Sequence, residues 1–281
     1  MKFASHDSIS IAGKKINEDI VYATDNYGWV IDGATGLNNK NLTTSSSDAN
    51  WFVNEWNKYL KENILDNSIS IKEIVYNGIE IVSNKFNKIT SLKNLDKVDL
   101  PSASIVILRI KNMMIEYFLL GDCTLIVQNN NGESSIIKQK LLDILDDKAK
   151  MEMAKLMANQ GMNFTDARQK INSLLVKHRR LKNVANGYWT LEFDKNAVEY
   201  SLCGYLEFDE CKNALLMSDG FSAIYDNYNY VDKNDIVNLV KKQGLKKIYK
   251  SIRFIEKEDE EILKYPRFKK SDDSSAVIFS K

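Results

Sequence analysis

The sequence predicts an α+β fold in which helices pack on antiparallel β-sheets. Strand patterns and helix patterns alternate in blocks along the 281 residues, in the order strands, helices, strands, helices and a final strand. Short hairpin signals join the central strands and favour antiparallel pairing. Only two prolines occur, and no glycine-rich or low-complexity linker is visible. We therefore expect residues 1–281 to form a single domain.

The N-terminal part of the chain predicts two short strands followed by two amphipathic helices. Strands are expected at 19–24 and 27–32, where β-branched and aromatic residues predominate. Helices are expected at 48–60 and 71–86, because apolar residues return there every three or four positions. Ser47 directly precedes the first helix and is a candidate for its N-cap.

The middle of the chain predicts an antiparallel meander with at least one buried face. Lys111-Asn112 separates the first two of its four apolar runs, and Asn131-Gly132, a strong hairpin signal, separates the last two. The four runs are residues 102–110, 113–120, 123–128 and 134–138.

Helical spacing returns after the meander and gives way once more to strands. The segment at about 139–188 has helical periodicity and a polar outer side, so we interpret it as an insert between strands. Strands are expected at 197–202 and 213–218, followed by two helices within about 233–257. A final strand is expected at 275–280.

Composition excludes several classes of function. The formal net charge is +1, so no global field attracts nucleic acid or an anionic membrane. No apolar run approaches the roughly 20 residues of a membrane-spanning helix, and the N-terminus lacks a signal-peptide pattern. The three cysteines lack metal-ligand spacing, and with only His6 and His178 a histidine-rich zinc site is excluded. We expect a cytoplasmic protein without a nucleic-acid or membrane partner.

Acidic residues stand at the ends of predicted strands in five places. Each alone is typical of a turn, because aspartate bonds the backbone and glycine accepts a positive φ. Five together indicate a shared site, because rigid strand ends can hold carboxylates in fixed mutual geometry. They are Glu18 and Asp19 in NED, Asp32 in WVIDG, Asp122 in YFLLGD, Asp219 in ALLMSDG, and the pair Asp272 and Asp273 in SDDSSAVIF.

Convergent carboxylates without histidine or cysteine indicate a site for hard divalent cations. Mg²⁺ and Mn²⁺ prefer oxygen ligands, and clustered anions repel one another unless cations lie between them. Two such ions, roughly 3.5–4 Å apart, can share a carboxylate and a water and lower the pKa of that water. The residues therefore predict a two-metal hydrolase acting on phosphate esters.

In content and order these motifs resemble those of the PP2C (PPM) family of metal-dependent Ser/Thr protein phosphatases. NED, DGATG, LGDC, LLMSDGF and DDSSAVI occur in the family's order over residues 17–278. The resemblance implies an αββα four-layer sandwich, two antiparallel sheets flanked by helix pairs, with the insert at about 139–188 as the variable flap. It also implies hydrolysis of phosphoserine and phosphothreonine in proteins by a water bridging two Mn²⁺ or Mg²⁺ ions.

The resemblance implies metal-binding roles for five residues. Asp32 would bridge both ions, and Gly33 would bind one of them through its backbone carbonyl. Asp219 and Asp273 would be terminal ligands of the other ion. Asp122, together with Asp219, would bind a weaker third ion.

Further residues would act beside the metals. Glu18 would orient metal-bound water, with Asp19 next to it. Many family members clamp the substrate phosphate with an arginine where this chain has Lys14, which keeps the charge but loses the bidentate fork. Lys15 is an equally basic neighbour, so the position of this contact stays open by one residue. Ala34 stands where some members have a histidine that protonates the leaving group.

Other classes fit less well or differ in substrate. A haloacid-dehalogenase phosphatase needs an aspartate two residues before Asp32, where this chain has Val30. No glycine-rich nucleotide-binding motif is present. A weakened or inactive PP2C-like module with a binding or regulatory role is one alternative, and a phosphatase of small phosphorylated molecules is another. Ser274 is a further departure, because asparagine commonly follows the family's last aspartate. As partner we expect a phosphorylated protein that a Ser/Thr kinase modifies, bound by a monomer.

Overall fold

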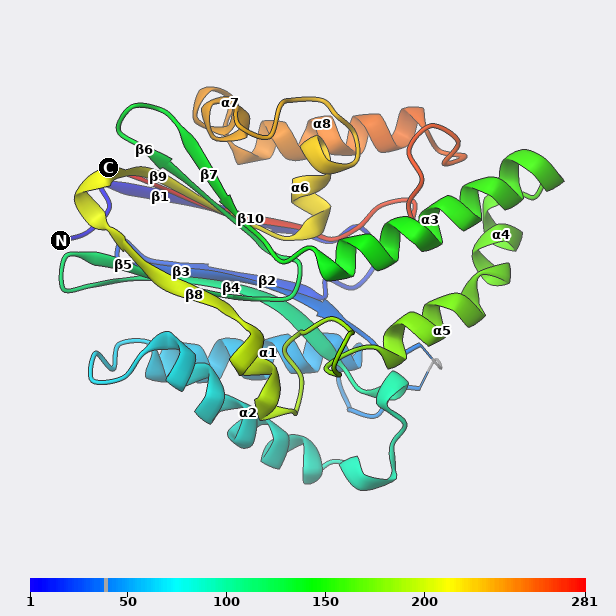
Figure 1. The fold of residues 1–281 in the computed structure, drawn as a ribbon, viewed down its shortest axis with the longest axis horizontal. Helices are drawn as coiled ribbons and strands as arrows, with labels where there is room; N and C mark the ends of the chain where they lie inside the picture. Colours follow the sequence, from blue (N-terminus) through cyan, green and yellow to red (C-terminus); the bar gives the residue numbers. More distant parts are fainter. Residues whose placement is uncertain (38–39) are drawn as a thin grey trace.

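Two five-stranded sheets form the centre of the computed structural model, which describes residues 1–37 and 40–281 (Figure 1). All strand pairs are antiparallel. Sheet A has, in spatial order, β1 (Ser5–Ile11), β10 (Ser274–Ser280), β9 (Cys211–Met217), β6 (Thr124–Asn129) and β7 (Ser134–Ile137). Sheet B has β2 (Asp19–Ala23), β3 (Tyr27–Ala34), β4 (Ser102–Lys111), β5 (Met114–Leu120) and β8 (Leu202–Glu207).

Helices cover the outer face of each sheet (Figure 1). Sheet B carries α1 (Asp48–Asn63) and α2 (Ile71–Asn87), and sheet A carries α6 (Asp219–Asp226), α7 (Ile236–Gln243) and α8 (Leu245–Glu258). The layer order of helices, sheet, sheet and helices confirms the expected αββα sandwich. Within the described residues, no helix combines the length and apolar character needed to span a membrane.

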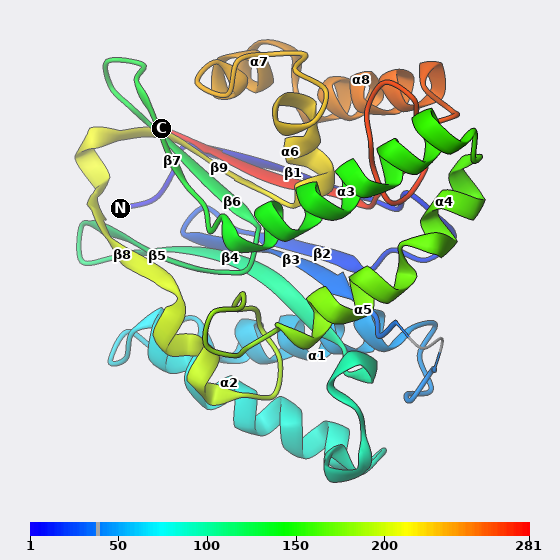
Figure 2. The same cartoon turned by 45° about the vertical axis from the view of Figure 1, so that its right-hand side comes forward.

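Three more helices follow β7 and form an arch at one end of the layers (Figure 2). They are α3 (Leu141–Gln160), α4 (Phe164–Lys170) and α5 (Asn172–Arg180), and we call them the α3–α5 arch. A small apolar cluster including Ala149, Met153 and Ile171 holds them together. In both views α3 starts beside α6, and α5 returns to the level of α1. The arch therefore reaches from one outer layer to the other.

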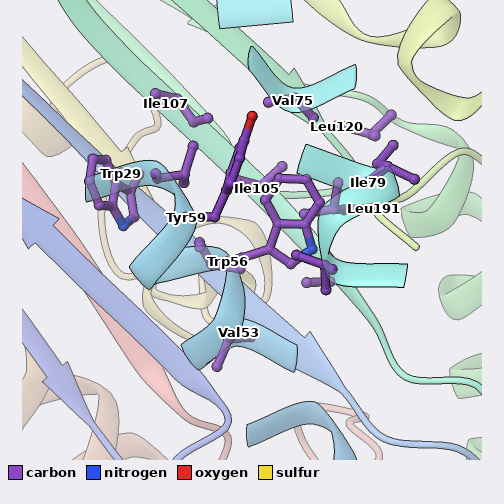
Figure 3. Close-up of a cluster of buried hydrophobic side chains, with 14 of the residues drawn as sticks. Trp29, Val53, Trp56, Tyr59, Val75, Ile79, Ile105, Ile107, Leu120 and Leu191 are labelled. Carbon is purple, nitrogen blue, oxygen red and sulfur yellow. The ribbon is translucent and has the colours of Figure 1, made fainter. Parts of the chain in front are cut away.

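Apolar side chains fill the space between the two sheets and the space under each helix layer. Between the sheets lie Val30, Val106 and Phe279, all fully buried. Under α1, Trp56 and its neighbours pack on the outer face of sheet B (Figure 3). The central strands are thus covered on both faces, which explains their nearly continuous apolar runs. The carboxylates described below stand at the ends of these buried strands.

The predicted helix starts are confirmed by their capping bonds. The Ser47 hydroxyl accepts a hydrogen bond from the backbone N–H of Asn50 at 3.1 Å. Ser70 and Glu73 form a reciprocal capping box at the start of α2. Each cap satisfies backbone donors that have no partner inside the helix.

Some sequence expectations differ from the structure. Residues 197–202 were expected to be a strand, but Lys195–Tyr200 is a 3₁₀ helix, started by Asp194, which accepts from the Asn196 N–H. The strand begins only at β8, which is largely exposed at the edge of sheet B. Strand β1 and helix α6 were not expected. β1 is an edge strand with four exposed residues, so it lacks the apolar run that marks a buried strand.

A buried ion pair joins sheet B to the connection between α1 and α2. The Arg109 guanidinium of β4 contacts Glu116 of β5 at 2.5 Å, with both side chains nearly inaccessible to solvent. Arg109 also donates to the backbone carbonyls of Ile64 and Ile69, and Glu116 accepts from the Ile71 N–H at 2.7 Å. All strong donors and acceptors of the pair are therefore engaged.

Replacing Glu116 by alanine is expected to lower the free energy of unfolding by about 3–5 kcal/mol, because it leaves the Arg109 charge buried without its partner. Urea unfolding measures this change. The matched control is Glu80→Ala, which breaks the exposed pair with Lys195 and should cost about 1 kcal/mol or less. Equal effects of the two substitutions would contradict a special contribution of the buried pair.

Candidate functional site

A cavity of about 700 Å³ lies where the ends of both sheets meet the α3–α5 arch. Of the eight residues given a role in the site from the sequence, six line it: Lys14, Glu18, Asp32, Gly33, Asp122 and Asp219. Asp19 and Asp273 are buried beside the cavity and do not line it. Five sequence segments that are far apart along the chain therefore meet at one place.

The register of sheet B aligns three of the acidic residues in a row. Asp19 of β2 lies opposite Asp32 of β3, and Asp32 lies opposite Ser104 of β4. The Ser104 hydroxyl donates to Asp122 (Oγ to Oδ1, 2.5 Å) and accepts from the Asp122 backbone N–H at 3.1 Å. Backbone pairing therefore sets where Asp19 and Asp32 stand, and the Ser104 hydroxyl ties Asp122 to the same row.

Gly121 allows Asp122 to come this close to β4. Its φ is +96°, in the region that favours glycine, and a Cβ at this position would lie 2.2 Å from the Ser104 Oγ. The glycine of the LGD motif is thus required by the approach of two backbone segments.

Sheet A contributes the opposite side of the site. β9 ends at Met217, which pairs with Ala276 of β10. Asp219, just after β9, and Asp272, just before β10, therefore emerge next to each other. Between them the chain runs so close that a Cβ on Gly220 would lie 1.9 Å from the Asp273 carbonyl oxygen. Only glycine fits at this position without moving the backbone.

The two consecutive aspartates before β10 face different ways. Asp272 lines the cavity, whereas both carboxylate oxygens of Asp273 accept backbone hydrogen bonds, from the N–H of Gly13 at 2.8 Å and of Glu18 at 2.7 Å. This alternation is the usual behaviour of an extended chain. Asp273, expected as a metal ligand, thus fixes the loop that carries Lys14 and Glu18, and Asp272 occupies the position facing the site.

The N-terminal loop presents Glu18 and Lys14 to the cavity. Glu18 Oε1 accepts a hydrogen bond from the Thr35 hydroxyl at 2.6 Å, which orients the carboxylate beside the end of β3. Lys14 lines the cavity, and its neighbour Lys15 is exposed outside it. Of the two lysines left open by the sequence, Lys14 is the one that faces the site.

The carboxylates carry more negative charge than their surroundings neutralise. Burial raises the pKa of Asp32 well above its usual value, and the charges of Asp19, Asp219, Asp122 and Asp272 raise it further. Burial likewise raises the pKa of Asp19, whose Oδ2 is enclosed and has no hydrogen-bond partner among the described residues. Burial and the Asp272 charge raise the pKa of Asp219 to about 6. Such a cluster favours the binding of cations.

Two lysines in the cavity partly offset this charge. Lys269 contacts Asp272 (Nζ to Oδ1, 2.6 Å), and Lys138 contacts Asp143 at 3.0 Å and Asp226 at 3.1 Å. Burial opposes the charge of each lysine, but the neighbouring carboxylates outweigh burial and raise both pKa values. Neither lysine could be recognised from the sequence, since nothing in a lone lysine near a strand marks it as a site residue.

The α3–α5 arch adds titratable groups to the opposite wall. Asp146 of α3, and His178 and Arg179 of α5, line the cavity. The Arg179 guanidinium lies 3.5 Å from the Thr35 carbonyl and so joins the arch to the end of β3. Burial raises the pKa of Asp146 to about 7, with Lys150 opposing the shift.

Replacing Asp146 by asparagine is expected to flatten the pH dependence of stability in EDTA. Between about pH 4 and pH 7 the unfolded chain loses the Asp146 proton while the folded chain keeps it, so the free energy of unfolding falls as pH rises. The loss is on the order of 2 kcal/mol, because one pKa unit corresponds to about 1.4 kcal/mol and the cavity is partly open to solvent. Urea unfolding at several pH values measures it.

Asp147→Asn is the matched control for Asp146→Asn, since Asp147 is the exposed neighbour on the same helix. It should keep the wild-type slope of stability against pH. If Asp146→Asn also kept that slope, a group other than Asp146 would cause the pH dependence of stability.

Comparison with known proteins decides the fold but not the activity. No protein-family model matches the sequence, and no curated protein sequence is significantly similar to it. Among solved structures, the serine/threonine phosphatase PstP/Ppp of Mycobacterium tuberculosis superposes with a TM-score of 0.57 at 13% identity, covering 98% of this chain and 97% of that one. PppA of Pseudomonas aeruginosa, a regulatory component of a type VI secretion system, gives 0.54 at 15% identity, covering 98% and 96%.

The chain has the PP2C fold. A further structure with this likeness is the catalytic domain of PstP in complex with two manganese ions, with a TM-score of 0.53 at 13% identity, covering 98% of this chain and 97% of that one. The predicted fold and layer order are thereby confirmed.

The PP2C fold implies divalent metal ions, and the donor set of this chain suits them. Asp32, Asp219 and Asp272 offer carboxylate oxygens and Gly33 a backbone carbonyl, the hard ligands that Mn²⁺ and Mg²⁺ prefer. The orphaned Oδ2 of Asp19 and the raised pKa values mark negative charge in excess. Within the described part of the chain, no three His, Cys, Asp or Glu side chains already converge on one point, so binding requires some of them to turn.

Proposed function

We propose that this protein is a metal-dependent phosphatase that hydrolyses phosphoserine and phosphothreonine in proteins. The observation that carries the proposal is the meeting of five acidic sequence motifs in one cavity of a PP2C fold, with carboxylates whose charges are only partly neutralised. The size of the cavity, about 700 Å³, suits a phosphorylated side chain with its neighbouring residues. The solved phosphatases with this fold support the same activity class.

In this proposal two Mn²⁺ or Mg²⁺ ions are held by residues at the ends of both sheets. Asp32, which stands in the centre of the carboxylates, would hold the ions together with the Gly33 carbonyl beside it. Asp219 would be a ligand on the side of sheet A, and Asp122 together with Asp219 would hold a weaker third ion. When bound, the ions supply the positive charge that activates water for attack on the phosphorus.

We propose Asp272 rather than Asp273 as the last metal ligand. Asp272 faces the cavity beside Asp219, whereas both oxygens of Asp273 are engaged by backbone N–H groups. If Asp272 is matched to the family's last metal-binding aspartate, Asp273 takes the next position, where family members commonly have asparagine. Ser274 no longer occupies that position. An amide oxygen at that position can accept one of the two backbone bonds that Asp273 accepts here.

The remaining residues bind and orient the reactants. The Lys14 ammonium binds phosphoryl oxygens as a point charge, without the two parallel hydrogen bonds that arginine offers. Glu18, oriented by Thr35, accepts a hydrogen bond from the attacking water, and Asp19 supports Asp32 from the neighbouring strand. Ala34 supplies no proton to the leaving group. No side chain in these motifs is placed as a nucleophile, so the reaction needs no phosphoenzyme.

The proposal predicts that p-nitrophenyl phosphate is hydrolysed in the presence of Mn²⁺ and that EDTA abolishes this turnover. Nitrophenolate leaves without needing a proton, so this substrate tests the metal centre separately from the missing donor at Ala34. The rate of nitrophenolate release, measured with Mn²⁺, with Mg²⁺, with EDTA and after Mn²⁺ is restored, is the readout.

A second set of substrates separates the alternatives. Phosphoserine and phosphothreonine peptides should be cleaved with higher kcat/KM than small phosphorylated metabolites, and the reverse order would assign the enzyme to small molecules. No metal-dependent release from any substrate would leave the PP2C fold with a binding or regulatory role.

A further inference from the structure

We propose that Lys269 is a built-in counter-ion of the metal centre, whose ammonium group competes with a divalent ion for the carboxylate of Asp272. The inference rests on the proposed function in one respect: it takes Asp272 as a metal ligand. It adds that the chain itself supplies a cation at that ligand and so sets how tightly the metal is held.

The contact between the two side chains is direct. Lys269 Nζ lies 2.6 Å from Asp272 Oδ1, and both residues line the cavity together with Asp32 and Asp219. Lys269 stands three residues before Asp272 in one loop, so the pair forms without long-range rearrangement. An ammonium at this distance occupies one of the oxygens that a metal ion would use.

The backbone on the N-terminal side of Lys269 is anchored by the residue two positions earlier. The Arg267 guanidinium contacts Asp259 at 2.7 Å and donates to the carbonyl oxygens of Glu256 and Lys270. Arg267 is almost fully buried, so this network is a fixed part of the loop. These contacts hold the loop through protein groups alone.

Phe268 ties the same loop to the α3–α5 arch. Its ring packs against the small apolar core of the arch, with Lys150 Nζ 5.8 Å and the Arg168 guanidinium carbon 5.7 Å from the ring centroid. On the other side, the Arg253 guanidinium donates to the Asp272 carbonyl at 3.0 Å. Lys269 is therefore held between two anchored segments, and its half-exposed side chain lines the cavity.

A tethered cation of this kind weakens metal binding in a defined way. A metal ion that needs Asp272 binds only the fraction of molecules in which the ammonium has moved away, and its apparent affinity falls by that fraction. The effect applies to the ion held by Asp272. An ion held by Asp32 and Gly33 loses no ligand to Lys269, so only one class of site should respond.

Lys270 provides a matched control for Lys269. It carries the same charge one position later, but it is exposed and pairs with Glu260 at 3.0 Å on the outside of the loop. Lys270→Gln therefore makes the same change in net charge and composition as Lys269→Gln without touching Asp272.

The test is titration of Mn²⁺ into the wild type, Lys269→Gln and Lys270→Gln by isothermal calorimetry, with thermal unfolding of each protein in EDTA. Lys269→Gln should bind one Mn²⁺ about tenfold more tightly than the wild type, as expected if the ammonium covers Asp272 in about nine molecules of ten. It should also lower the Tm in EDTA by about 2–4 °C, because Asp272 loses its counter-ion. Lys270→Gln should match the wild type in both measurements.

The outcomes separate this inference from the proposed function. Equal or weaker Mn²⁺ binding by Lys269→Gln, in a protein whose wild type binds Mn²⁺ and hydrolyses p-nitrophenyl phosphate, would overturn the role of Lys269 alone. No Mn²⁺ binding by any of the three proteins would overturn both. Binding by Lys269→Gln and not by the wild type would support the counter-ion and show that the native chain is held in a metal-free state.

Discussion

Asp32→Asn is expected to lower Mn²⁺-dependent hydrolysis of p-nitrophenyl phosphate by about 10³-fold or more. Asp32 stands between Asp19 on the neighbouring strand and Asp219 of sheet A, so in the proposed metal centre its carboxylate would contact both ions. Two metal ions contribute several kcal/mol of transition-state stabilisation, and each 1.4 kcal/mol corresponds to a factor of ten in rate. Asparagine keeps the shape and removes the charge.

The same substitution should leave the metal-free protein at least as stable as the wild type. Burial and neighbouring carboxylates raise the pKa of Asp32, which means that its charged form is unfavourable in the fold. Thermal unfolding in EDTA should therefore give an unchanged or higher Tm for Asp32→Asn. A substitution that lowers activity but does not lower stability is typical of a residue retained for function.

The control for Asp32→Asn is Asp209→Asn, which changes an exposed aspartate at the far end of β9. It should keep full activity. Turnover within tenfold of the wild type for Asp32→Asn would remove Asp32 from the metal centre and with it the bridging role.

The second large effect is expected at the aspartate pair that precedes β10. Asp272→Asn should reduce Mn²⁺-dependent turnover by about 10²-fold or more, because it removes a charged ligand beside Asp219. Asp273→Asn should reduce turnover by less than about tenfold. Instead it should lower the free energy of unfolding by about 1–3 kcal/mol, because the amide group leaves one of two backbone N–H groups without an acceptor.

Both variants are measured for kcat/KM on p-nitrophenyl phosphate and for stability in urea with EDTA. The pair serves as its own control, since the two substitutions are chemically identical and adjacent. Loss of turnover in Asp273→Asn with near-normal turnover in Asp272→Asn would restore the assignment first drawn from the sequence.

Much of the fold could be predicted because its strands and helices are buried on a regular face. The apolar run that contains Val106 and the hairpin signal Asn131-Gly132 identify β4 and the turn between β6 and β7 without tertiary information. β1 was not predicted because an exposed edge strand carries no apolar run. The prediction of a strand at 197–202 was wrong because Ala197 and Val198 belong to a 3₁₀ helix and are buried there. Their apolar character is the same as that of a buried strand.

A site residue could be predicted where a motif places it directly at the end of a strand. It could not be predicted where its role depends on which way its side chain points. Asp32 and Asp122 follow buried strands, so their place in the cavity could be expected. Asp272 and Asp273 both precede β10, and which of them faces the cavity depends on a backbone contact with Gly13 that sequence does not reveal. Lys269 enters the site only because the Arg267 network shapes its loop.

The proposed ligands stand on two different sheets: Asp32 at the end of β3 in sheet B, and Asp219 and Asp272 beside β9 and β10 in sheet A. The distance between these ligands therefore depends on the thickness of the apolar core between the sheets, to which Val30 and Phe279 contribute. The interior of the sandwich would thus act as the spacer of the proposed metal centre. Its side-chain volumes would then be constrained by the chemistry proposed at the rim, and not by stability alone.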